Sequence, residues 1–475
     1  MKYCLLHLGC QMNQSDAERV RTVIEAMGYQ RTESEEEADL LGVVSCSVRQ
    51  RAIDRAYALV RKWNSWKDHR TLLTFATGCI LPVDRERFLK QFDFLFPIDE
   101  LPQLPDMIRQ YGVVTPASGA HVSTREAPPA PADGGGLLTL TDASRYYWQI
   151  KPRYSSTIEA YVPIQNGCDK FCTFCAVPYT RGRELSRPSA EVLEEVSSLV
   201  ERGYRSITLL GQNVNSYGLD RKGAEISFAD LLRRIGEMGN GSGRRFWVYF
   251  TSPHPRDMTE EVIRAVARYP CLAKQIHLPL QSGDDKVLIR MNRNYRVDEY
   301  RAVVQSIRAL LPEATLFTDI IVGFTGETEE QFENTRKAMR EFQYSMAFVA
   351  QYSPRPGAAS YRWPDDVPHE EKKRRLRELS EELRASALAW NRRMVGRSVA
   401  VLVDGRDRKP GWLSGRTEGR IPVRFPSADE SLIGAIVDVT ITETAPLSME
   451  GELAIPGAPS AAPRYPALPS SSRHP

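Results

Sequence analysis

Five short apolar segments recur through the middle of the chain, and stretches typical of helices lie between them. We predict buried strands at residues 206–210, 246–250, 274–278, 316–322 and 347–351, with helices such as 189–202 between them. Repeated strand–helix units require a parallel sheet with right-handed crossovers, because the chain must return to the same edge before each new strand. The pattern therefore predicts a central α/β domain that ends in a charged helix at about residues 369–390.

The first hundred residues repeat this alternation on a smaller scale. Predicted strands at 3–8, 40–44 and 72–76 alternate with predicted helices at 15–27 and 48–63. In a parallel α/β sheet, ligands bind outside the carboxyl ends of the strands. Cys10, Cys46 and Cys79 each follow one of these strand ends within one to three residues. We expect these three thiols, distant in sequence, to meet at one edge of the sheet.

Changes in composition divide the chain into further parts. Proline and glycine are dense between residues 127 and 136, which is typical of a linker. Short β-branched segments at 398–403, 421–425 and 436–441 predict a small β-barrel. Alanine, proline and serine dominate after residue 453, which indicates a disordered tail. We therefore expect an α/β multidomain protein, divided into an N-terminal domain (1–125), a linker (126–155), a central domain (156–386), a barrel (387–453) and a tail (454–475).

Composition excludes several classes of protein. Apolar residues make up 42% and charged residues 26% of the 475 positions, which excludes a fully disordered chain. There is no run of about 18 apolar residues and no signal-peptide pattern, so we expect a cytoplasmic protein without a membrane span. The net charge is only +3, so any basic surface for nucleic acid must be local.

Three cysteines in the central domain form a compact motif. Cys168, Cys172 and Cys175 have the spacing C-x3-C-x2-C, directly after an apolar segment at 160–164. Three thiolates can hold three irons of a cubane cluster, which leaves a fourth iron open to a small molecule. The alternative is a zinc knuckle, but zinc sites normally take two pairs of ligands, and no histidine or fourth cysteine lies nearby in the sequence.

This motif inside an α/β segment resembles the radical S-adenosylmethionine (SAM) superfamily. The resemblance implies that residues 156–386 form a partial (β/α) barrel. It also implies a [4Fe–4S] cluster on Cys168, Cys172 and Cys175, with SAM bound to the open iron. Such enzymes cleave SAM to a radical that removes hydrogen from an unreactive C–H bond, so the hardest chemistry belongs to the cofactor.

The second cysteine set has two interpretations. Cys10, Cys46 and Cys79 could be isolated buried thiols, since free cysteine often behaves as a small hydrophobe. However, the strings around them (LGCQMN, SCSVR and TGC) resemble the N-terminal domain of the methylthiotransferase family. That resemblance implies an auxiliary [4Fe–4S] cluster on these three residues, which delivers sulfur to a substrate carbon.

The resemblance to this family extends to about residue 453. The matching strings lie at 178–182, 210–218, 251–255, 277–283, 318–324 and 352–357. They are similar to the MiaB-type branch, the tRNA-2-methylthio-N-6-dimethylallyladenosine synthases, which add a methylthio group to C2 of N-6-dimethylallyladenosine next to the anticodon of tRNA. The chain departs from the family at Ser45, at 80–82 and at Thr325, but none of these departures removes a cysteine.

Polar residues at the predicted carboxyl ends of the central strands are candidates to hold SAM or the base. They are Gln212, Asn213, Ser252, His277, Gln281 and Asp319. We expect His254 and His277 to form hydrogen bonds rather than to ligate a metal. No catalytic residue is expected beyond the cluster ligands.

The segment 391–424 carries nine basic residues against three acidic ones, an excess of +6. The basic residues are Arg392, Arg393, Arg397, Arg406, Arg408, Lys409, Arg416, Arg420 and Arg424. Together with Trp412 and Phe425, this patch suits phosphate contacts and base stacking, although it could also be a solvated surface. The string GRTE at 415–418 resembles the TRAM domain, which implies RNA binding.

Several functions compete at this stage. The leading interpretation is a tRNA methylthiotransferase that acts on N-6-dimethylallyladenosine. The alternatives are the branch that acts on threonylcarbamoyladenosine, the branch that modifies an aspartate of a ribosomal protein, and a non-enzymatic zinc or RNA-binding protein. The enzyme interpretations imply tRNA, a reductant such as flavodoxin or ferredoxin, and a sulfur donor as partners. We expect a monomer with no membrane partner.

Overall fold

The N-terminal sheet has five parallel strands in the order β2-β1-β3-β4-β5. Its strands are β1 (Lys2–His7), β2 (Gln30–Arg31), β3 (Leu40–Cys46), β4 (Leu73–Cys79) and β5 (Phe94–Leu95). The helices are α1 (Gln11–Ala26), α2 (Gln50–Trp66), α3 (Pro82–Leu89), the 3-10 helix η1 (Ile98–Gln103) and α4 (Leu104–Gln110). Every residue of β3 and β4 is buried, as expected for central strands covered by helices on both faces.

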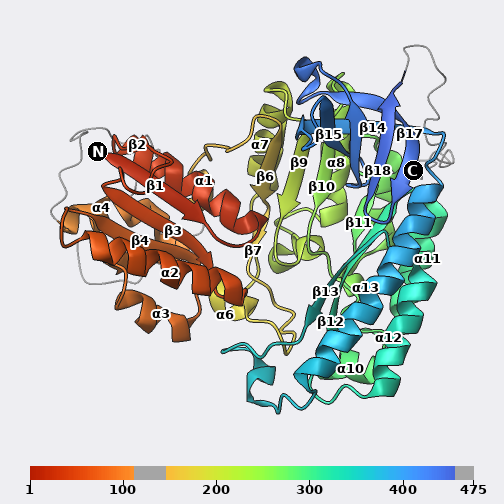
Figure 1. The fold of residues 1–475 in the computed structure, drawn as a ribbon, viewed down its shortest axis with the longest axis horizontal. Helices are drawn as coiled ribbons and strands as arrows, with labels where there is room; N and C mark the ends of the chain where they lie inside the picture. The colour runs from red at the N-terminus through yellow and green to blue at the C-terminus, as the bar shows by residue number, and fades with distance from the viewer. Residues whose placement is uncertain (112–145, 455–475) are drawn as a thin grey trace.

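The structure, a computed structural model, describes residues 1–111 and 146–454 (Figure 1). All but the first residue of the tail predicted at 454–475, and most of the predicted linker, therefore lie outside the described residues. The central sheet consists of β6 (Glu159–Pro163), β9 (Ser206–Leu210), β10 (Trp247–Phe250), β11 (Gln275–His277), β12 (Thr315–Val322) and β13 (Met346–Gln351). These strands form two parallel three-stranded sheets, β10-β9-β6 and β11-β12-β13. A parallel bridge between Val248 and Leu272 joins the two into one curved surface.

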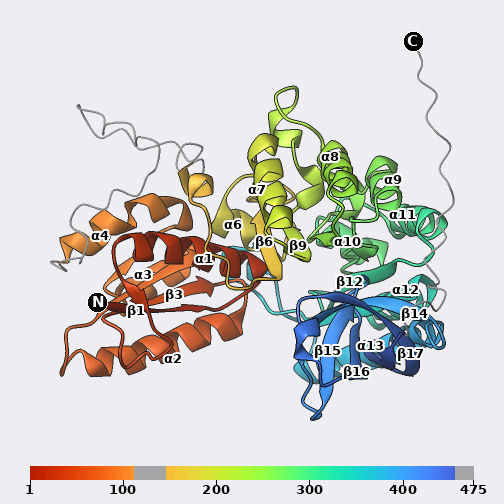
Figure 2. The same ribbon diagram turned by 90° about the horizontal axis from the view of Figure 1, so that it is seen from above.

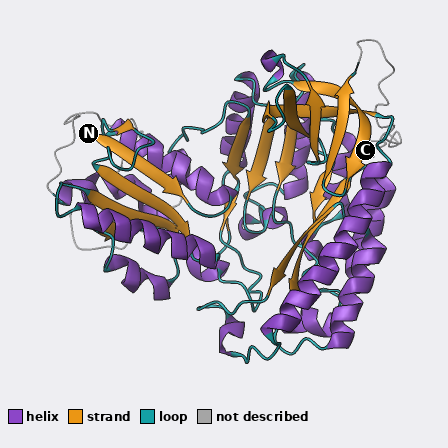
Figure 3. Cartoon of the chain, in the orientation of Figure 1, coloured by secondary structure: helices purple, strands orange, loops and turns teal. Residues whose placement is uncertain are grey.

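Helices cover the outer face of this curved sheet (Figure 3). They are α7 (Ser189–Glu201), α8 (Phe228–Gly241), α9 (Glu260–Arg268), α10 (Asp285–Arg290), α11 (Val297–Leu310), α12 (Glu329–Phe342) and α13 (His369–Arg392). Shorter elements are α6 (Val177–Arg181), the hairpin β7 (Gln165–Asn166) and β8 (Leu185–Ser186), and the 3-10 helices η2 (Val214–Ser216), η3 (Leu219–Arg221), η4 (Pro255–Asp257) and η5 (Ala359–Arg362). Ile207, Val248 and Ile276 point outward into the hydrophobic core under the helices. Because side chains alternate along a strand, Thr208, Tyr249 and His277 face the concave side.

The C-terminal barrel is closed, with strand order β14-β15-β16-β18-β17. Its elements are β14 (Ser398–Arg406), β15 (Trp412–Thr417), β16 (Pro422–Pro426), the 3-10 helix η6 (Glu430–Leu432), β17 (Ile436–Ala445) and β18 (Ser448–Leu453). The three predicted segments correspond to β14, β16 and β17, whereas β15 and β18, which are poor in β-branched residues, are not predicted. Helix α13 runs across residue 387, at which the sequence analysis separates the central domain from the barrel.

The barrel lies against the central domain on the side away from the N-terminal domain (Figures 1 and 2). The turn after β15 fits into the central sheet at the amino-terminal ends of its strands. The Glu418 carboxylate accepts a hydrogen bond from the Lys274 amide (3.0 Å), and the Thr315 hydroxyl donates to the Gly419 carbonyl (2.8 Å). Phe317 of β12 packs in the hydrophobic core of the barrel. The barrel is therefore continuous with the central core rather than a separate appendage.

The described residues contain no helix that is both long and apolar enough to cross a membrane.

The close packing of the turn after β15 against the central sheet, which we call the seam, predicts that Gly419→Ala destabilises the protein. An added methyl group would lie 2.6 Å from Cγ2 and 2.9 Å from Oγ1 of the buried Thr315. We expect a loss of about 1–3 kcal/mol, typical of overpacking, seen as a lower melting temperature. Gly405→Ala on β14 is the matched control, since nothing lies within 4 Å of its added methyl group. Equal melting temperatures for the two variants would contradict a tightly packed seam.

Candidate functional site

The three cysteines of the N-terminal domain meet at the carboxyl edge of its sheet. Cys46 and Cys79 are the last residues of β3 and β4 and are register partners, so both strands extend to the cysteines instead of ending before them. Cys10 follows β1 and precedes α1. The expectation that these thiols share one edge is thus confirmed in the fold.

Asn13 connects the three cysteine segments, although the sequence analysis gives it no role. Its Oδ1 accepts hydrogen bonds from the Cys10 amide (3.2 Å) and from the Cys10 thiol (3.4 Å). Its Nδ2 donates to the Ser45 carbonyl (3.0 Å) and lies 3.8 Å from the Cys79 sulfur. The contact at Cys10 starts α1 at Gln11, four residues before the predicted start. Asn13 therefore fixes the relative positions of all three strand ends.

The thiols of this set differ in acidity. A hydrogen bond with Cys79 lowers the pKa of Cys46 to about 7, although burial opposes the shift. The same hydrogen bond, together with burial, raises the pKa of Cys79. Cysteine binds metals as the thiolate. Of this pair, Cys46 therefore loses its proton more readily at neutral pH than Cys79 does.

A buried ion pair connects this cysteine set to the central domain. Arg181, at the end of α6, donates from Nε to the Cys79 sulfur (2.9 Å). Its guanidinium also forms an ion pair with Asp16 of α1, and the Tyr147 hydroxyl donates to the same carboxylate (2.6 Å). The side chains of Arg181 and Asp16 are only 3% and 0% exposed. Arg181 lies in the family-like string at 178–182, but its pairing with Asp16 spans 165 residues and leaves no signal in the sequence.

The central cysteine set lies on the loop between β7 and α6. Backbone and side-chain hydrogen bonds hold this loop against the end of α10: the Thr173 amide donates to the Met291 carbonyl (3.0 Å), and Asn292 Nδ2 donates to the Phe171 carbonyl (3.0 Å). The buried Arg293 donates from Nη1 to the Cys172 sulfur (3.4 Å). The loop is thus held in one conformation by its neighbours.

Burial controls the acidity of the central thiols. It raises the pKa of Cys168 to about 11 and that of Cys175 to about 12, and neighbouring thiols add to both shifts. Metal binding must therefore displace protons from these two residues.

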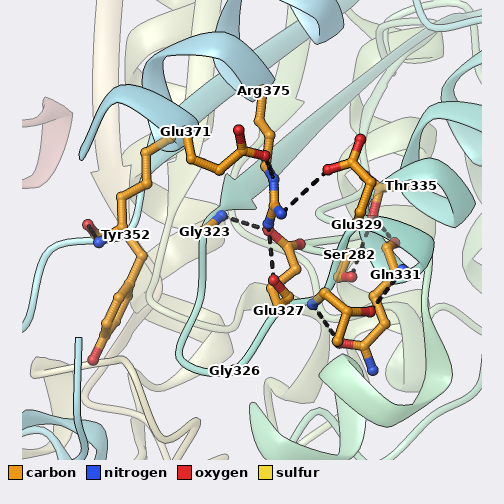
Figure 4. A network of polar contacts seen from close by, with 12 residues as sticks. Ser282, Gly323, Gly326, Glu327, Glu329, Gln331, Thr335, Tyr352, Glu371 and Arg375 are labelled. Atoms are coloured by element: carbon orange, nitrogen blue, oxygen red, sulfur yellow. Dashed lines mark hydrogen bonds and ion pairs between the residues drawn. The ribbon is translucent and has the colours of Figure 1, made fainter. Parts of the chain in front are cut away.

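A network of polar contacts supports the loop that follows β12 (Figure 4). Glu327 accepts hydrogen bonds from the Gly323 amide (2.5 Å) and from Arg375 of α13 (2.9 Å). Phe324 on this loop packs edge-on against Phe174, which lies between two of the central cysteines. Helix α13 therefore helps to position the cysteine loop, although it contributes no ligand.

Two of the six predicted polar residues present unsatisfied acceptors. Gln212 Oε1 and Asn213 Oδ1 are buried and have no hydrogen-bond partner within the described part of the chain. Asn213 Nδ2 donates to Asp257 (3.2 Å), and Asp257 forms an ion pair with Lys170 of the cysteine loop (2.6 Å). These contacts place Gln212 and Asn213 beside the cysteine loop, as a binding site for a small polar ligand requires. Lys170 and Asp257 are not among the site residues predicted from the sequence.

The other four predicted residues lie on the concave side or at its rim. His277 Nε2 is 2.8 Å from an oxygen of Asp319, so this histidine forms hydrogen bonds as expected. Ser252 and Gln281 have φ angles of +57° and +70°. Such left-handed backbone is costly for residues other than glycine and often occurs at functional sites.

The nine basic residues of the C-terminal segment do not form one surface. Arg420 donates to the Thr208 hydroxyl (2.8 Å) and lies 4.0 Å above the Tyr249 ring, and Arg416 pairs with Glu159 (3.4 Å). These two arginines therefore belong to the seam with the central domain.

The other basic residues fall into two groups. Arg393 and Arg397 pair with Glu313 of the central domain, at 3.5 Å each. Arg406 and Arg424 pair with carboxylates of the barrel, and Lys409 covers the Trp412 ring at 3.5 Å. Arg392 and Arg408 are exposed and have no ion-pair partner among the described residues. The prediction that Phe425 stacks on bases is wrong, because strand alternation turns Phe425 into the barrel core, where it is fully buried.

A cavity of about 600 Å³ opens where the N-terminal domain meets the central domain. It borders Ser47, the neighbour of Cys46, and its lining includes Arg61, Arg87 and Arg355. Arg355 donates to Gln50 across the two domains (2.8 Å). Asp54 and Asp84 also line it, so the cavity carries charges of both signs with a small basic excess. It lies beside the N-terminal cysteine set.

The chemistry of each cysteine set fits an iron–sulfur cluster. Among the described residues, no three or more histidine, cysteine or acidic side chains are arranged to hold a single metal ion. A cubane cluster instead takes one thiolate on each of several irons, so three thiols can hold it. One arginine also donates to a sulfur of each set, which suits anionic thiolates.

Comparisons with known proteins agree with this geometry. Residues 2–96 match the uncharacterized protein family UPF0004, residues 162–339 match the radical SAM superfamily, and residues 392–454 match the TRAM domain. The tRNA-2-methylthio-N(6)-dimethylallyladenosine synthase of Geobacter metallireducens is 39% identical over 454 residues, which cover 94% of this chain and 97% of the relative. The protein of the same name from Shigella boydii is 36% identical over 452 residues, covering 94% and 90%.

Solved structures support the fold. The radical S-adenosylmethionine methyltransferase TsrM from Kitasatospora setae superposes with a TM-score of 0.52 at 14% identity, covering 76% of this chain and 75% of its own. The predicted α/β multidomain fold, with a radical SAM domain and a C-terminal TRAM barrel, is confirmed.

The buried pair predicts that Asp16→Ala destabilises the contact between the N-terminal and central domains. The substitution leaves the Arg181 charge buried and without its carboxylate, which costs about 3–5 kcal/mol. We expect a lower melting temperature and faster limited proteolysis between the two domains. The control is Asp106→Ala, whose ion pair with Arg109 is exposed and contributes about 0–1 kcal/mol. Equal stability of both variants would contradict a structural role for the buried pair.

Proposed function

Because the chain belongs to the family of tRNA-2-methylthio-N(6)-dimethylallyladenosine synthases, we propose that it is a radical SAM methylthiotransferase that adds a methylthio group to C2 of N-6-dimethylallyladenosine next to the anticodon of tRNA. The observation that carries this proposal is the presence of two three-cysteine sets, one in the radical SAM domain and one in the N-terminal domain. A methylthiotransferase needs both a radical source and a sulfur source.

Each cysteine set would hold one [4Fe–4S] cluster. Cys168, Cys172 and Cys175 would bind the cluster that receives SAM, and Cys10, Cys46 and Cys79 would bind the auxiliary cluster. When bound, the first cluster and SAM supply the radical chemistry and the auxiliary cluster supplies sulfur. The protein holds these groups, orients them and limits their exposure to water.

The polar residues of the central domain would orient SAM and the base. The unsatisfied oxygens of Gln212 and Asn213 lie beside the cysteine loop and suit the donor groups of SAM. Ser252, His277, Gln281 and Asp319 would contact SAM or the adenine. The hydrogen bond between His277 and Asp319 fixes the orientation of the imidazole ring. The target adenosine must leave its loop to reach this side, as bases do in other enzymes that modify them.

The exposed basic residues of the barrel, which are Arg406, Arg408, Lys409 and Arg424, would bind the tRNA backbone. The cavity beside Ser47, with its three arginines, would receive the anticodon loop. We further propose a flavodoxin or ferredoxin as reductant and an external sulfur donor. We propose a monomer that acts in the cytoplasm, since tRNA is its substrate.

Nucleoside mass spectrometry of tRNA from a deletion strain tests the substrate. We expect loss of the 2-methylthio group from dimethylallyladenosine and its return when the gene is restored. Loss of the group from threonylcarbamoyladenosine alone would instead assign the chain to the other tRNA branch.

The two cysteine sets predict two separable defects. Cys168→Ala, Cys172→Ala or Cys175→Ala should abolish reductive formation of 5′-deoxyadenosine, because the cluster that binds SAM is lost. Cys10→Ala, Cys46→Ala or Cys79→Ala should retain SAM cleavage but give no methylthiolated tRNA. A variant in which all three cysteines of one set are replaced by alanine should still bind about four irons at the other set. Methylthiolation by the N-terminal triple variant would show that these thiols are structural.

The barrel predicts salt-dependent tRNA binding. Deletion of the barrel is a poor test, because it would expose Phe317 and the seam. Instead, Arg408→Glu should raise the apparent KM for tRNA several-fold and reduce the salt slope of binding by about 0.9 for each lost phosphate contact. SAM cleavage without tRNA should not change. The matched control is Lys337→Glu on α12, which is exposed and far from the barrel strands in sequence. An unchanged salt slope for Arg408→Glu would exclude this residue from the RNA contact.

A further inference from the structure

Each cysteine set receives one hydrogen bond from a buried arginine, and both arginines belong to the central domain. Arg181 Nε lies 2.9 Å from the Cys79 sulfur, and Arg293 Nη1 lies 3.4 Å from the Cys172 sulfur. Arg181 is 8% and Arg293 is 6% exposed. A buried guanidinium is expensive to desolvate, so two such groups placed against two thiols require a partner that offsets the cost.

The two arginines differ in their other partners. Arg181 forms an ion pair with the fully buried Asp16, so part of its charge is neutralised. Arg293 donates to the Pro279 carbonyl (3.2 Å) and to the Tyr295 hydroxyl (3.3 Å). Within the described ranges, 1–111 and 146–454, it has no carboxylate partner. The cationic charge at Cys172 is therefore less compensated than the charge at Cys79.

Charge and hydrogen bonds at ligand sulfurs set the reduction potential of an iron–sulfur cluster. Reduction adds negative charge, so a cationic donor stabilises the reduced form more than the oxidised form and raises the potential. Low exposure strengthens the effect, because water does not screen it.

We propose that Arg181 and Arg293 are positioning residues that each raise the reduction potential of one cluster: Arg181 that of the auxiliary cluster on Cys10, Cys46 and Cys79, and Arg293 that of the cluster on Cys168, Cys172 and Cys175. Arg181 does so from another domain. The auxiliary cluster therefore reaches its working potential only when the N-terminal domain is docked on the central domain. This inference rests on the proposed function, since it requires both clusters.

Spectroelectrochemical titration of each cluster alone tests the proposal. The auxiliary cluster is measured in the Cys168→Ala/Cys172→Ala/Cys175→Ala background, and the other cluster in the Cys10→Ala/Cys46→Ala/Cys79→Ala background. We expect Arg181→Gln to lower the midpoint potential of the auxiliary cluster only, and Arg293→Gln to lower that of the other cluster only. Arg181→Lys, which keeps the charge, should restore part of the shift.

Asp16→Asn provides a test of opposite sign. It removes the negative charge that partly neutralises Arg181 but keeps an amide oxygen that can accept a hydrogen bond from the guanidinium. In protein whose two domains stay docked, as checked by limited proteolysis, it should raise the auxiliary potential where Arg181→Gln lowers it. A purely structural role would shift both variants in the same direction.

Arg19→Gln is the matched control. Arg19 is fully buried on α1, donates to Ser15 (2.8 Å) and pairs with Glu195 (3.8 Å), so it is a paired buried cation like Arg181 but makes no contact with a cysteine sulfur. Its substitution should leave both potentials unchanged.

Three outcomes would overturn the proposal. The first is an unchanged auxiliary potential in iron-loaded Arg181→Gln. The second is an equal shift in Arg19→Gln. The third is a loss of iron binding in all three Arg181 variants, namely Arg181→Gln, Arg181→Lys and Arg181→Gln/Asp16→Asn, while Arg19→Gln still binds iron. Arg181 would then be needed for assembly of the cluster rather than for its potential. A wild-type chain that binds fewer than two clusters would instead refute the proposed function itself.

Discussion

Parallel strand pairing determines where the chemistry of this protein can occur. In a parallel sheet all carboxyl ends lie at one edge, so residues far apart in sequence converge there without any contact between the segments that carry them. Cys46 and Cys79 are adjacent because β3 and β4 pair residue by residue from Leu40 to Cys46. The same rule brings Gln212 to the cysteine loop of the central domain. Strand pairing thus brings together the cysteines of the N-terminal site, whereas in the central site the cysteines share one loop and strand pairing supplies the polar residues beside it.

The carboxyl edges of the N-terminal and central sheets must also face each other. No strand pairing among the described residues joins these two sheets, and a buried ion pair holds them together instead. Arg181 follows the central cysteines in sequence but contacts Cys79 and Asp16 in the N-terminal domain. An ion pair with both side chains almost fully buried contributes little net stability, but it is costly to break. It therefore selects one docked arrangement of the two domains over others. The apolar contacts of the same interface have no comparable directionality.

The sequence reveals the parts of this structure that follow from periodicity and local spacing. Alternating strands and helices predict both α/β domains, and the cysteine positions relative to strand ends predict where the thiols lie. Long-range side-chain contacts such as those of Asn13 and Arg181 leave no periodic signal, so sequence reasoning misses them. Phe425 is a different case, because its alternation with the exposed Arg424 predicts an inward side chain. Composition alone was the wrong guide there.

The position of the barrel limits what it can contribute to catalysis. Its turn meets the central sheet at Thr315, the first residue of β12, whereas the cysteine loop lies at the carboxyl edge. The eight residues of β12 span about 26 Å, so RNA bound to the barrel as proposed would still have to extend along the central domain to reach the thiols. Contacts at that distance add affinity but cannot orient one base. Orientation must come from groups near the carboxyl edge, where the N-terminal domain places Arg61 and Arg87 and the central domain places Arg355 around one cavity. The proposed function therefore places RNA binding and RNA positioning at opposite ends of the central domain.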